Sequence, residues 1–353
     1  MNSFFKFLST SFRFLKSDTT TFIIKKFLSI ILALLGLSFL IFVLARVLPG
    51  DPARMAVGAS APDWVIEEMR KRLRLDRPLH EQYIAWMADL LKGDLGFSVY
   101  TKRSVTYDIL QYLPATLELL IFTEIFSVLG GIFLGVIAGS HAYKWPDNVV
   151  RVLAYIAISM PAFAWAIILQ LLFVRIIPLF PALGRISVEP PPRITGLIIL
   201  DSLIVGRLDV IPNALWHMTL PALSLSFGSM MQNARILRSG MVDVKGKQYM
   251  LLAEALGLPF RVKRLKFQLK PAVAPAITAM ALSFGADMGN AFLVETVYNW
   301  PGLMRYGVTA MLNKDLNAIV AVTLSVGLVY AIANFAADII IYLLDPRIRH
   351  TAR

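Results

Sequence analysis

The sequence contains no cysteine, so disulfide bonds, thiolate catalysis and cysteine-based metal sites are excluded together. Histidine is scarce too, and its four positions are scattered over different segments without pairing with one another or with carboxylates: His80, His141, His217 and His350. That scatter argues against a metal site. Neither a GxSxG elbow nor a GxxxxGK[ST] phosphate loop occurs. We therefore expect no enzyme and no cofactor, and energy for uphill movement must come from a partner or an ion gradient.

Charged residues are also few, at 16% of the 353 residues, whereas 57% are apolar. This balance, with a mean hydropathy of +0.65, exceeds that of ordinary soluble domains and predicts an all-α polytopic membrane protein. Six apolar stretches are long enough to be transmembrane helices: residues 27–48, 114–139, 149–177, 214–236, 271–294 and 316–343. The predicted organisation is one span at 27–48, an external loop domain at 49–113, and a transmembrane core of five helices at 114–343.

The net charge of +12 follows the predicted spans, so we interpret it first as a topology signal. Residues 49–113 hold nine basic and nine acidic side chains, which favours an external position, and the segment at 178–213 is balanced as well. Residues 237–270 hold eight basic and two acidic side chains, which predicts a cytoplasmic loop. The first 26 residues and the basic tail at 344–353 are predicted to be cytoplasmic, with residues 1–26 forming an interfacial amphipathic helix.

Short helices are predicted within the external loop domain at 62–75 and 80–91. The segment Gly93-Asp94-Leu95-Gly96 predicts a turn; no lysine-serine pair follows it, which disfavours a phosphate-binding loop. Pro161 interrupts the third predicted span and is expected to kink a packed helix, with a kink that lines the substrate path as the alternative.

Polar residues at membrane depth are the candidates for a translocation path: Glu124, Asp287, Asn290 and Glu295. A carboxyl there costs about 2.5–3.5 kcal/mol on insertion scales, so it usually faces protein or water. Asp287 and Asn290 share a helix face by their spacing. Hydrogen bonding between neighbouring helices is an equally good explanation, and for Asp338 we expect a packing role.

Residues 248–275, QYMLLAEALGLPFRVKRLKFQLKPAVAP, are a basic, helix-patterned segment between two predicted spans. Tyr249, Ala253, Glu254, Ala255 and Gly257 closely resemble the cytoplasmic coupling-loop motif of ABC importer permeases, in the dipeptide/oligopeptide branch. Leu256 stands where that branch usually has lysine. A loop that merely sits on anionic headgroups explains the lysines and arginines, but not Tyr249 or the alanine-glycine spacing. We expect the Gly257-Leu258-Pro259 step to end the helix.

Further segments resemble the same branch in the same order: residues 48–52 (LPGDP), 93–98 (GDLGFS), 113–119 (LPATLEL), 295–302 (ETVYNWPG) and 345–349 (DPRIR). The resemblance implies a type I ABC importer permease fold with six transmembrane helices. It implies as partners a homologous second permease, two cytoplasmic ATP-binding subunits that hold ATP and magnesium, and an extracellular substrate-binding protein. The coupling residues would contact the ATPases.

The resemblance also implies a multi-pass protein of the cytoplasmic membrane that imports di- or oligopeptides. Oligosaccharides or nickel are alternative substrates of the same machinery. An ion-coupled secondary transporter is a rival, although we find no pair of matching halves with broken helices. A membrane-bound enzyme would need a polar catalytic cluster near one interface, and the sequence shows none. Nucleic acid is not an expected partner.

Overall fold

The computed structural model describes residues 18–47, 52–58, 60–72 and 74–344, and nearly all regular structure in these ranges is helical. The helices are α2 (Asp18–Val47), α3 (Pro52–Val57), α4 (Asp63–Arg72), α5 (Leu79–Leu91), α6 (Val105–Ser140), α7 (Trp145–Ser159), α8 (Ala162–Gln170), η1 (Leu171–Ile176), α9 (Ile198–Val205), α10 (Val210–Lys245), α11 (Gln248–Ala255), α12 (Phe260–Val262), η2 (Lys263–Leu269), α13 (Lys270–Val297), α14 (Leu303–Leu312) and α15 (Leu316–Leu344). The predicted all-α class is confirmed.

Four helical stretches among the described residues are long and apolar enough to cross a membrane: Thr20–Ala45, Val105–Ser140, Pro275–Val297 and Leu316–Ile339. A fifth crossing arises if α7 and the segment from Ala162 to Ile176 count as one span. These two pieces meet at an angle of 108°, at Pro161. The break is therefore much sharper than the kink that the sequence predicts.

The fourth predicted span, residues 214–236, lies in α10. This helix is not among the candidate membrane-crossing helices, although it is 36 residues long. It lies at the centre of the bundle and packs against α6, α13, α7 and α8. Its polar side chains find partners on those neighbours: Asn233 donates to Ser127 (2.9 Å), and Ser224 lies 3.1 Å from the Tyr298 hydroxyl. Protein rather than lipid surrounds these groups, so the helix needs less apolar character than its neighbours.

Helices α6 and α10 approach most closely along a row of glycines on α6. A Cβ atom at Gly135 would come within 2.9 Å of the Ala234 carbonyl oxygen, and Gly131 and Gly139 are equally crowded by α10. Only hydrogen fits between the two backbones at these points. Small residues at such spacing allow membrane helices to pack through their backbones.

The start of α6 differs from the prediction, because the helix begins at Val105 rather than at residue 114. Pro114 lies inside it and cannot donate to the carbonyl four residues earlier. The Arg193 guanidinium supplies that missing bond, since its Nη2 donates to the Leu110 carbonyl at 2.7 Å. A distant arginine thus makes an internal proline tolerable.

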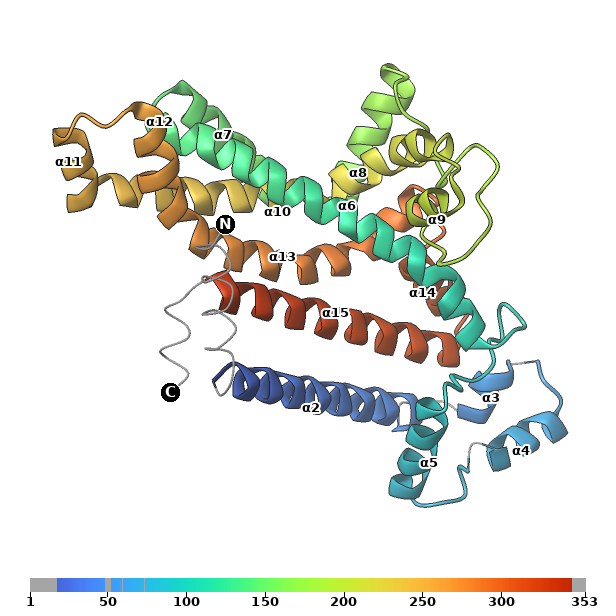
Figure 1. Ribbon diagram of the computed structural model, residues 1–353. Coiled ribbons are helices and arrows are strands. Elements are labelled where there is room, and N and C mark those ends of the chain that lie inside the picture. The colour runs from blue at the N-terminus through green and yellow to red at the C-terminus, as the bar shows by residue number, and fades with distance from the viewer. Residues whose placement is uncertain (1–17, 48–51, 59, 73, 345–353) are drawn as a thin grey trace.

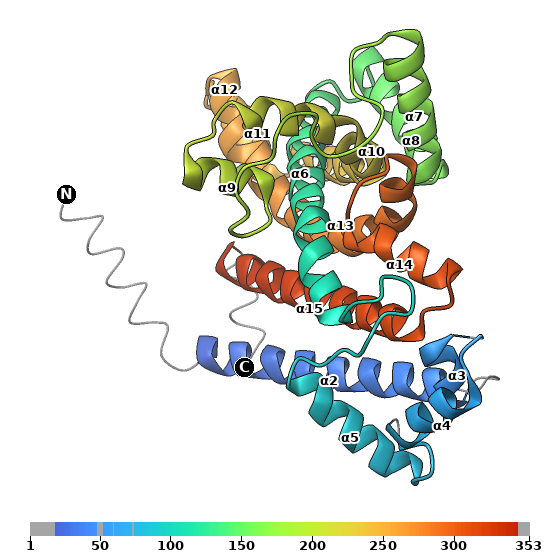
Figure 2. The same ribbon diagram turned by 90° about the vertical axis from the view of Figure 1, so that its right-hand side faces the viewer.

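Helix α2 lies along α15, and the two remain side by side in both views (Figures 1 and 2). It begins at Asp18 rather than at residue 27. The Lys26 ammonium lies 2.8 Å from the Asp338 carboxylate, so Asp338 joins α15 to α2. Large apolar side chains such as Leu32 cover the remaining surface of α2. Of the interfacial helix predicted at residues 1–26, residues 18–26 form the first part of α2, whereas residues 1–17 and the tail from residue 345 lie outside the described residues.

The short helices α3, α4 and α5 gather at one end of α2 (Figure 2). Helices α4 and α5 confirm the two predicted for the external loop, whereas α3 and α14 were not predicted. The Tyr83 ring packs edge-on against Phe39 and Phe42, and its hydroxyl lies 2.9 Å from Ser38 Oγ. Aromatic contacts of this kind hold the module to the span.

We predict that Gly135→Ala lowers the stability of the purified chain by about 1–3 kcal/mol, because the added methyl group overpacks the α6–α10 contact. Gly36→Ala is the matched control, since no atom lies within 4 Å of a Cβ added there. We expect the control to gain up to about 1 kcal/mol of stability, because alanine has a higher helix propensity than glycine. Thermal unfolding in detergent measures both, and equal melting temperatures would contradict the packing argument.

Candidate functional site

The segment between α10 and α13 forms a short helix, α11, at one end of the molecule (Figure 1). It packs against η2 and the end of α10. Ala253 is only 2% exposed and Met250 is also buried, so these two side chains face the protein. Tyr249 is 39% exposed, and Leu251, Leu252 and Leu256 are more exposed still. Helix α11 therefore presents an apolar face that no other described part of the chain covers.

The end of α11 is a paired hydrogen-bond motif built on a left-handed glycine. Gly257 has φ +64°, which L side chains rarely adopt. Its N–H donates to the Glu254 carbonyl (2.9 Å), and the Leu258 N–H donates to the Ala253 carbonyl (3.2 Å). These are the two bonds of a Schellman cap. The predicted helix end at Gly257-Leu258-Pro259 is confirmed, and Pro259 leads directly into α12.

The five sequence-predicted coupling residues thus divide into two groups. Tyr249, Glu254, Ala255 and Gly257 are exposed on the surface of this chain. Ala253 instead packs inward, so its small size serves the contact of α11 with its own chain. Periodicity on a helix of eight residues is too short to distinguish these two faces.

The end of α10 that leads into α11 is tied to the start of α7 by a buried ion pair. Arg238 donates to both oxygens of Asp147, at 2.9 Å from Nε and 2.6 Å from Nη2. The Tyr143 N–H donates to the same carboxylate (2.8 Å), and its ring lies 5.4 Å from the guanidinium carbon. Because two hydrogen bonds join the guanidinium to a fully buried carboxylate, the geometry of this bidentate pair is well fixed. It links helices α7 and α10 at the base of the α11 segment.

The membrane-depth candidates fall into three different environments. Asp287 is 2% exposed and accepts a hydrogen bond from Ser229 of α10 (2.9 Å). Glu124 of α6 interacts electrostatically with it, and within the described part of the chain Glu124 Oε1 has no hydrogen-bond partner. Asn290 is exposed on α13, so its side chain does not join Asp287. The structure brings Glu124 and Asp287 together and leaves Asn290 on the surface.

Glu295 occupies a closed interior network and is completely buried. Thr116 Oγ1 donates to its Oε1 (2.5 Å), and the Arg305 N–H donates to its Oε2 (2.9 Å). Thr116 in turn accepts from the Leu303 N–H at 2.7 Å. A Cβ at Gly302 would come within 2.3 Å of the Glu295 carboxylate, so only glycine fits there. These contacts give Glu295 a positioning role at the start of α14.

A second buried carboxylate, Glu118, joins α6 to the segment before α10. Arg185 forms a salt bridge to it, and the Ile199 N–H donates to its other oxygen (2.8 Å). Nearby, burial raises the pKa of Asp201, but hydrogen bonds from Thr195 and its neighbours outweigh burial and hold that pKa below the usual value. Sequence inspection missed Arg185, because nothing local marks an arginine in a proline-rich segment as a partner for α6.

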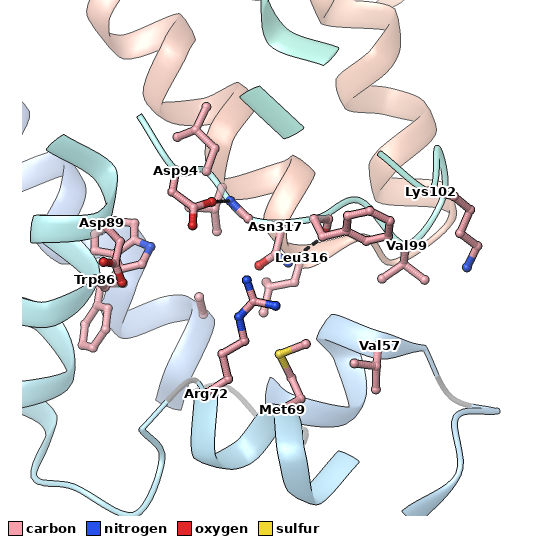
Figure 3. A pocket seen from close by; sticks show the side chains of 16 residues that line it. Val57, Met69, Arg72, Trp86, Asp89, Asp94, Val99, Lys102, Leu316 and Asn317 are labelled. Atoms are coloured by element: carbon pink, nitrogen blue, oxygen red, sulfur yellow. Dashed lines mark hydrogen bonds between the residues drawn. The ribbon is translucent and has the colours of Figure 1, made fainter. Parts of the chain in front are cut away.

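A cavity of about 290 Å³ lies between the α3–α5 module and the start of α15 (Figure 3). Arg72 of α4 reaches into it, with Asp89 and Trp86 of α5 on one side and Asn317 of α15 across from it. The turn at residues 93–96 forms part of its wall, and that turn is confirmed by positive φ values at Gly93 and Gly96. The cavity therefore combines charged, polar and aromatic groups.

The turn that borders this cavity is anchored on α15 by a fully buried carboxylate, Asp315. Ser98 Oγ donates to it at 2.5 Å and the Tyr100 N–H at 3.1 Å. Its other oxygen accepts from the Ala318 N–H (3.2 Å) and so caps the helix. The segment that follows the turn and α15 consequently share one polar anchor, Asp315.

Comparison with known proteins assigns almost the whole chain. Residues 131–350 match the family described as "Binding-protein-dependent transport system inner membrane component", and residues 19–120 match its N-terminal component. The chain belongs to this family. It is a multi-pass permease subunit of the inner membrane in a binding-protein-dependent ABC importer, and it is not itself catalytic. Permease subunits of this family carry no cofactor.

Several curated relatives match the permease over nearly its full length. The probable D,D-dipeptide transport system permease protein DdpB of Escherichia coli (strain K12) is 36% identical over 90% of this chain and 94% of its own. The dipeptide transport system permease protein DppB of Alkalihalophilus pseudofirmus is 32% identical over 92% and 98%. The glutathione transport system permease protein GsiC of Salmonella choleraesuis is 33% identical over 93% and 99%. Membership implies partner proteins: a substrate-binding protein and ATPase.

Proposed function

We propose that this permease imports short peptides. The names of its relatives support this substrate class, since they concern a D,D-dipeptide, dipeptides and glutathione. The absence of a nucleotide-binding motif in the sequence means that the energy enters through a partner. Within the class, specificity would reside largely in the external binding protein, so the permease needs a path rather than a tight pocket.

The proposed architecture has six spans. Five are the apolar candidates described above, with the bent pair counted as one span, and α10 is the sixth. Its length, its central position and its protein-covered polar side chains support this count. Both termini would then lie in the cytoplasm, together with the basic loop at 237–270, as the positive-inside rule requires. The 49–113 module would lie outside. A homologous second permease would complete the pathway.

The proposed path runs beside the polar groups shared by α6, α10 and α13. Glu124 and Asp287 would border it, and the exposed Asn290 would lie on the surface that faces the second permease. Glu295 would set the position of α14 beside the path from within its closed network. We assign it this indirect role because its carboxylate is completely buried.

Coupling would pass through α11 to two ATP-binding subunits. The exposed apolar face around Tyr249 supports this role, because such a face on a short helix fits a groove on a soluble partner. Movement of α11 would reach α10 directly and α7 through the Arg238–Asp147 pair. Rigid-body tilting of packed helices is an established way to alternate access.

The substrate class is tested with the complete transporter in proteoliposomes. We expect ATP-dependent uptake of a labelled dipeptide that unlabelled dipeptide suppresses and an oligosaccharide or nickel does not. The chain alone, under a proton or sodium gradient, should give no uptake. Uptake by the isolated chain would instead support the ion-coupled transporter and refute the importer.

Coupling is tested at the left-handed glycine. Gly257→Ala places a methyl group on a left-handed residue, which costs about 1–2 kcal/mol. We expect ATPase co-purification and ATP-driven uptake to fall by about 5- to 30-fold, the factor to which this cost corresponds. Gly246→Ala is the matched control in the same loop, because Gly246 has no positive φ and its added Cβ would contact only a carbonyl 3.9 Å away. Equal losses in both variants would argue against a specific role for the α11 turn.

The docking surface for the binding protein is proposed to include the cavity beside α4. Arg72→Glu reverses the charge at its centre, and we expect the affinity for the binding protein to fall about tenfold, or about 1.4 kcal/mol. Lys71→Glu is the matched control, because Lys71 is the neighbouring exposed cation and does not line the cavity. Binding is measured by titrating labelled binding protein onto the reconstituted complex. Unchanged affinity in the Arg72 variant would show that the cavity is not part of the interface with the binding protein.

A further inference from the structure

The cations of the cytoplasmic loop are not spread evenly over it. Helix α11 holds no basic residue, and Glu254 is its one charged side chain. The segment 260–270, here called the basic segment, holds five cations and no acidic residue: Arg261, Lys263, Arg264, Lys266 and Lys270. The loop thus contains an apolar helix followed by a strongly basic one.

One face of the basic segment is fixed to the bundle. Gln268 is buried and its Nε2 donates to the Met241 carbonyl of α10 at 3.0 Å. Arg264 Nη2 lies 3.5 Å from the Val136 carbonyl of α6. The basic segment therefore turns one side toward α10 and α6 and the other side away from the bundle.

Its outer face alternates cations with large apolar side chains. Phe260, Val262 and Leu265 are exposed there beside Arg261 and Lys266. Exposed apolar groups of this size are unfavourable in water, yet together with cations they match the boundary between headgroups and acyl chains. Long basic side chains reach from that boundary to the phosphates.

The position along the chain places the end of the basic segment, at Lys270, near the membrane boundary. The basic segment continues without a break into α13, whose apolar span begins at Pro275. At about 1.5 Å per helical residue, Lys270 lies about 7–8 Å from the start of that span. This distance is within the headgroup layer, which adds about 5–8 Å to each side of the hydrocarbon core. Figure 1 shows the chain turning between α12 and α13.

We propose that the basic segment binds anionic phospholipid headgroups of the inner leaflet and anchors the coupling loop at the membrane surface. Helix α11, which holds no cation, remains free for the ATPase. The inference rests on the proposed cytoplasmic orientation of this loop. Lipid binding next to the coupling helix would fix the base against which α11 moves, so that ATPase motion reaches α10 instead of displacing the whole loop.

The absence of cysteine permits a site-specific test in the full chain. Leu265→Cys and Leu251→Cys are labelled separately with the fluorophore NBD; the two leucines are equally exposed, at 59%, on the basic segment and on α11. Each labelled chain is reconstituted into phosphatidylcholine vesicles that contain doxyl-labelled phosphatidylcholine or doxyl-labelled phosphatidylglycerol. We expect quenching at Leu265 but not at Leu251, and at least twofold stronger quenching by the phosphatidylglycerol probe.

The charge dependence is tested by adding Arg261→Gln and Lys266→Gln to the Leu265→Cys chain. The preference for the phosphatidylglycerol probe should then fall to near one, as it should in high salt. Lys144→Gln, which removes an exposed cation from the turn between α6 and α7, should leave the preference unchanged.

Two outcomes would overturn the proposal. Equal quenching by both lipid probes would show that charge does not select the lipid. A Leu265 label that lipids do not quench, but that added ATPase subunits shield, would assign the basic segment to an acidic surface of that partner. The Leu251 label reports on the coupling role independently, since ATPase should shield it whether or not Leu265 contacts lipid.

Discussion

A completely buried carboxylate, Glu295, holds one end of the bundle together. Its two oxygens accept from Thr116 on α6 and from the Arg305 N–H at the start of α14. Around it the Trp300 indole N–H donates to the Ala115 carbonyl at 3.0 Å, and Gly302 leaves room for the carboxylate. A buried acid is tolerated only when its acceptors are used in this way. Two sequence segments that resemble recurrent permease motifs are therefore one physical contact.

The Glu295 network joins two long helices, α6 and α13. The Thr116–Glu295 hydrogen bond ties α6 to α13 at one end of these helices. Helix α10 lies between them and is the one that continues into α11. The Arg238–Asp147 pair joins α7 to α10 near the end of α10 that leads into α11.

Surroundings explain the unequal composition of the helices. Helix α2 contacts mainly α15 and exposes large apolar side chains over most of its surface, as a helix in hydrocarbon must. Helix α10 is covered by four neighbours, so serines and Asn233 can bond to them inside the bundle. The glycines of α6 bring the two backbones so close that little lipid contact remains for α10. Hydropathy therefore marks α2 more strongly than α10.

Local properties of the sequence determined the membrane class, the positions of the long helices, the turn at Gly93–Gly96 and the helix end at Gly257. These depend on apolar run length and on residues a few positions apart, which the chain displays directly. Only the tertiary structure decided that Ala253 faces inward, that Pro161 turns the chain by 108°, and that Thr116 meets Glu295 across 179 positions. Periodicity says which residues share a face of a helix, but the neighbour that this face meets follows from how all the helices pack. For that reason the sequence shows Glu295 at membrane depth but not that its carboxylate is buried and hydrogen-bonded to Thr116 and Arg305.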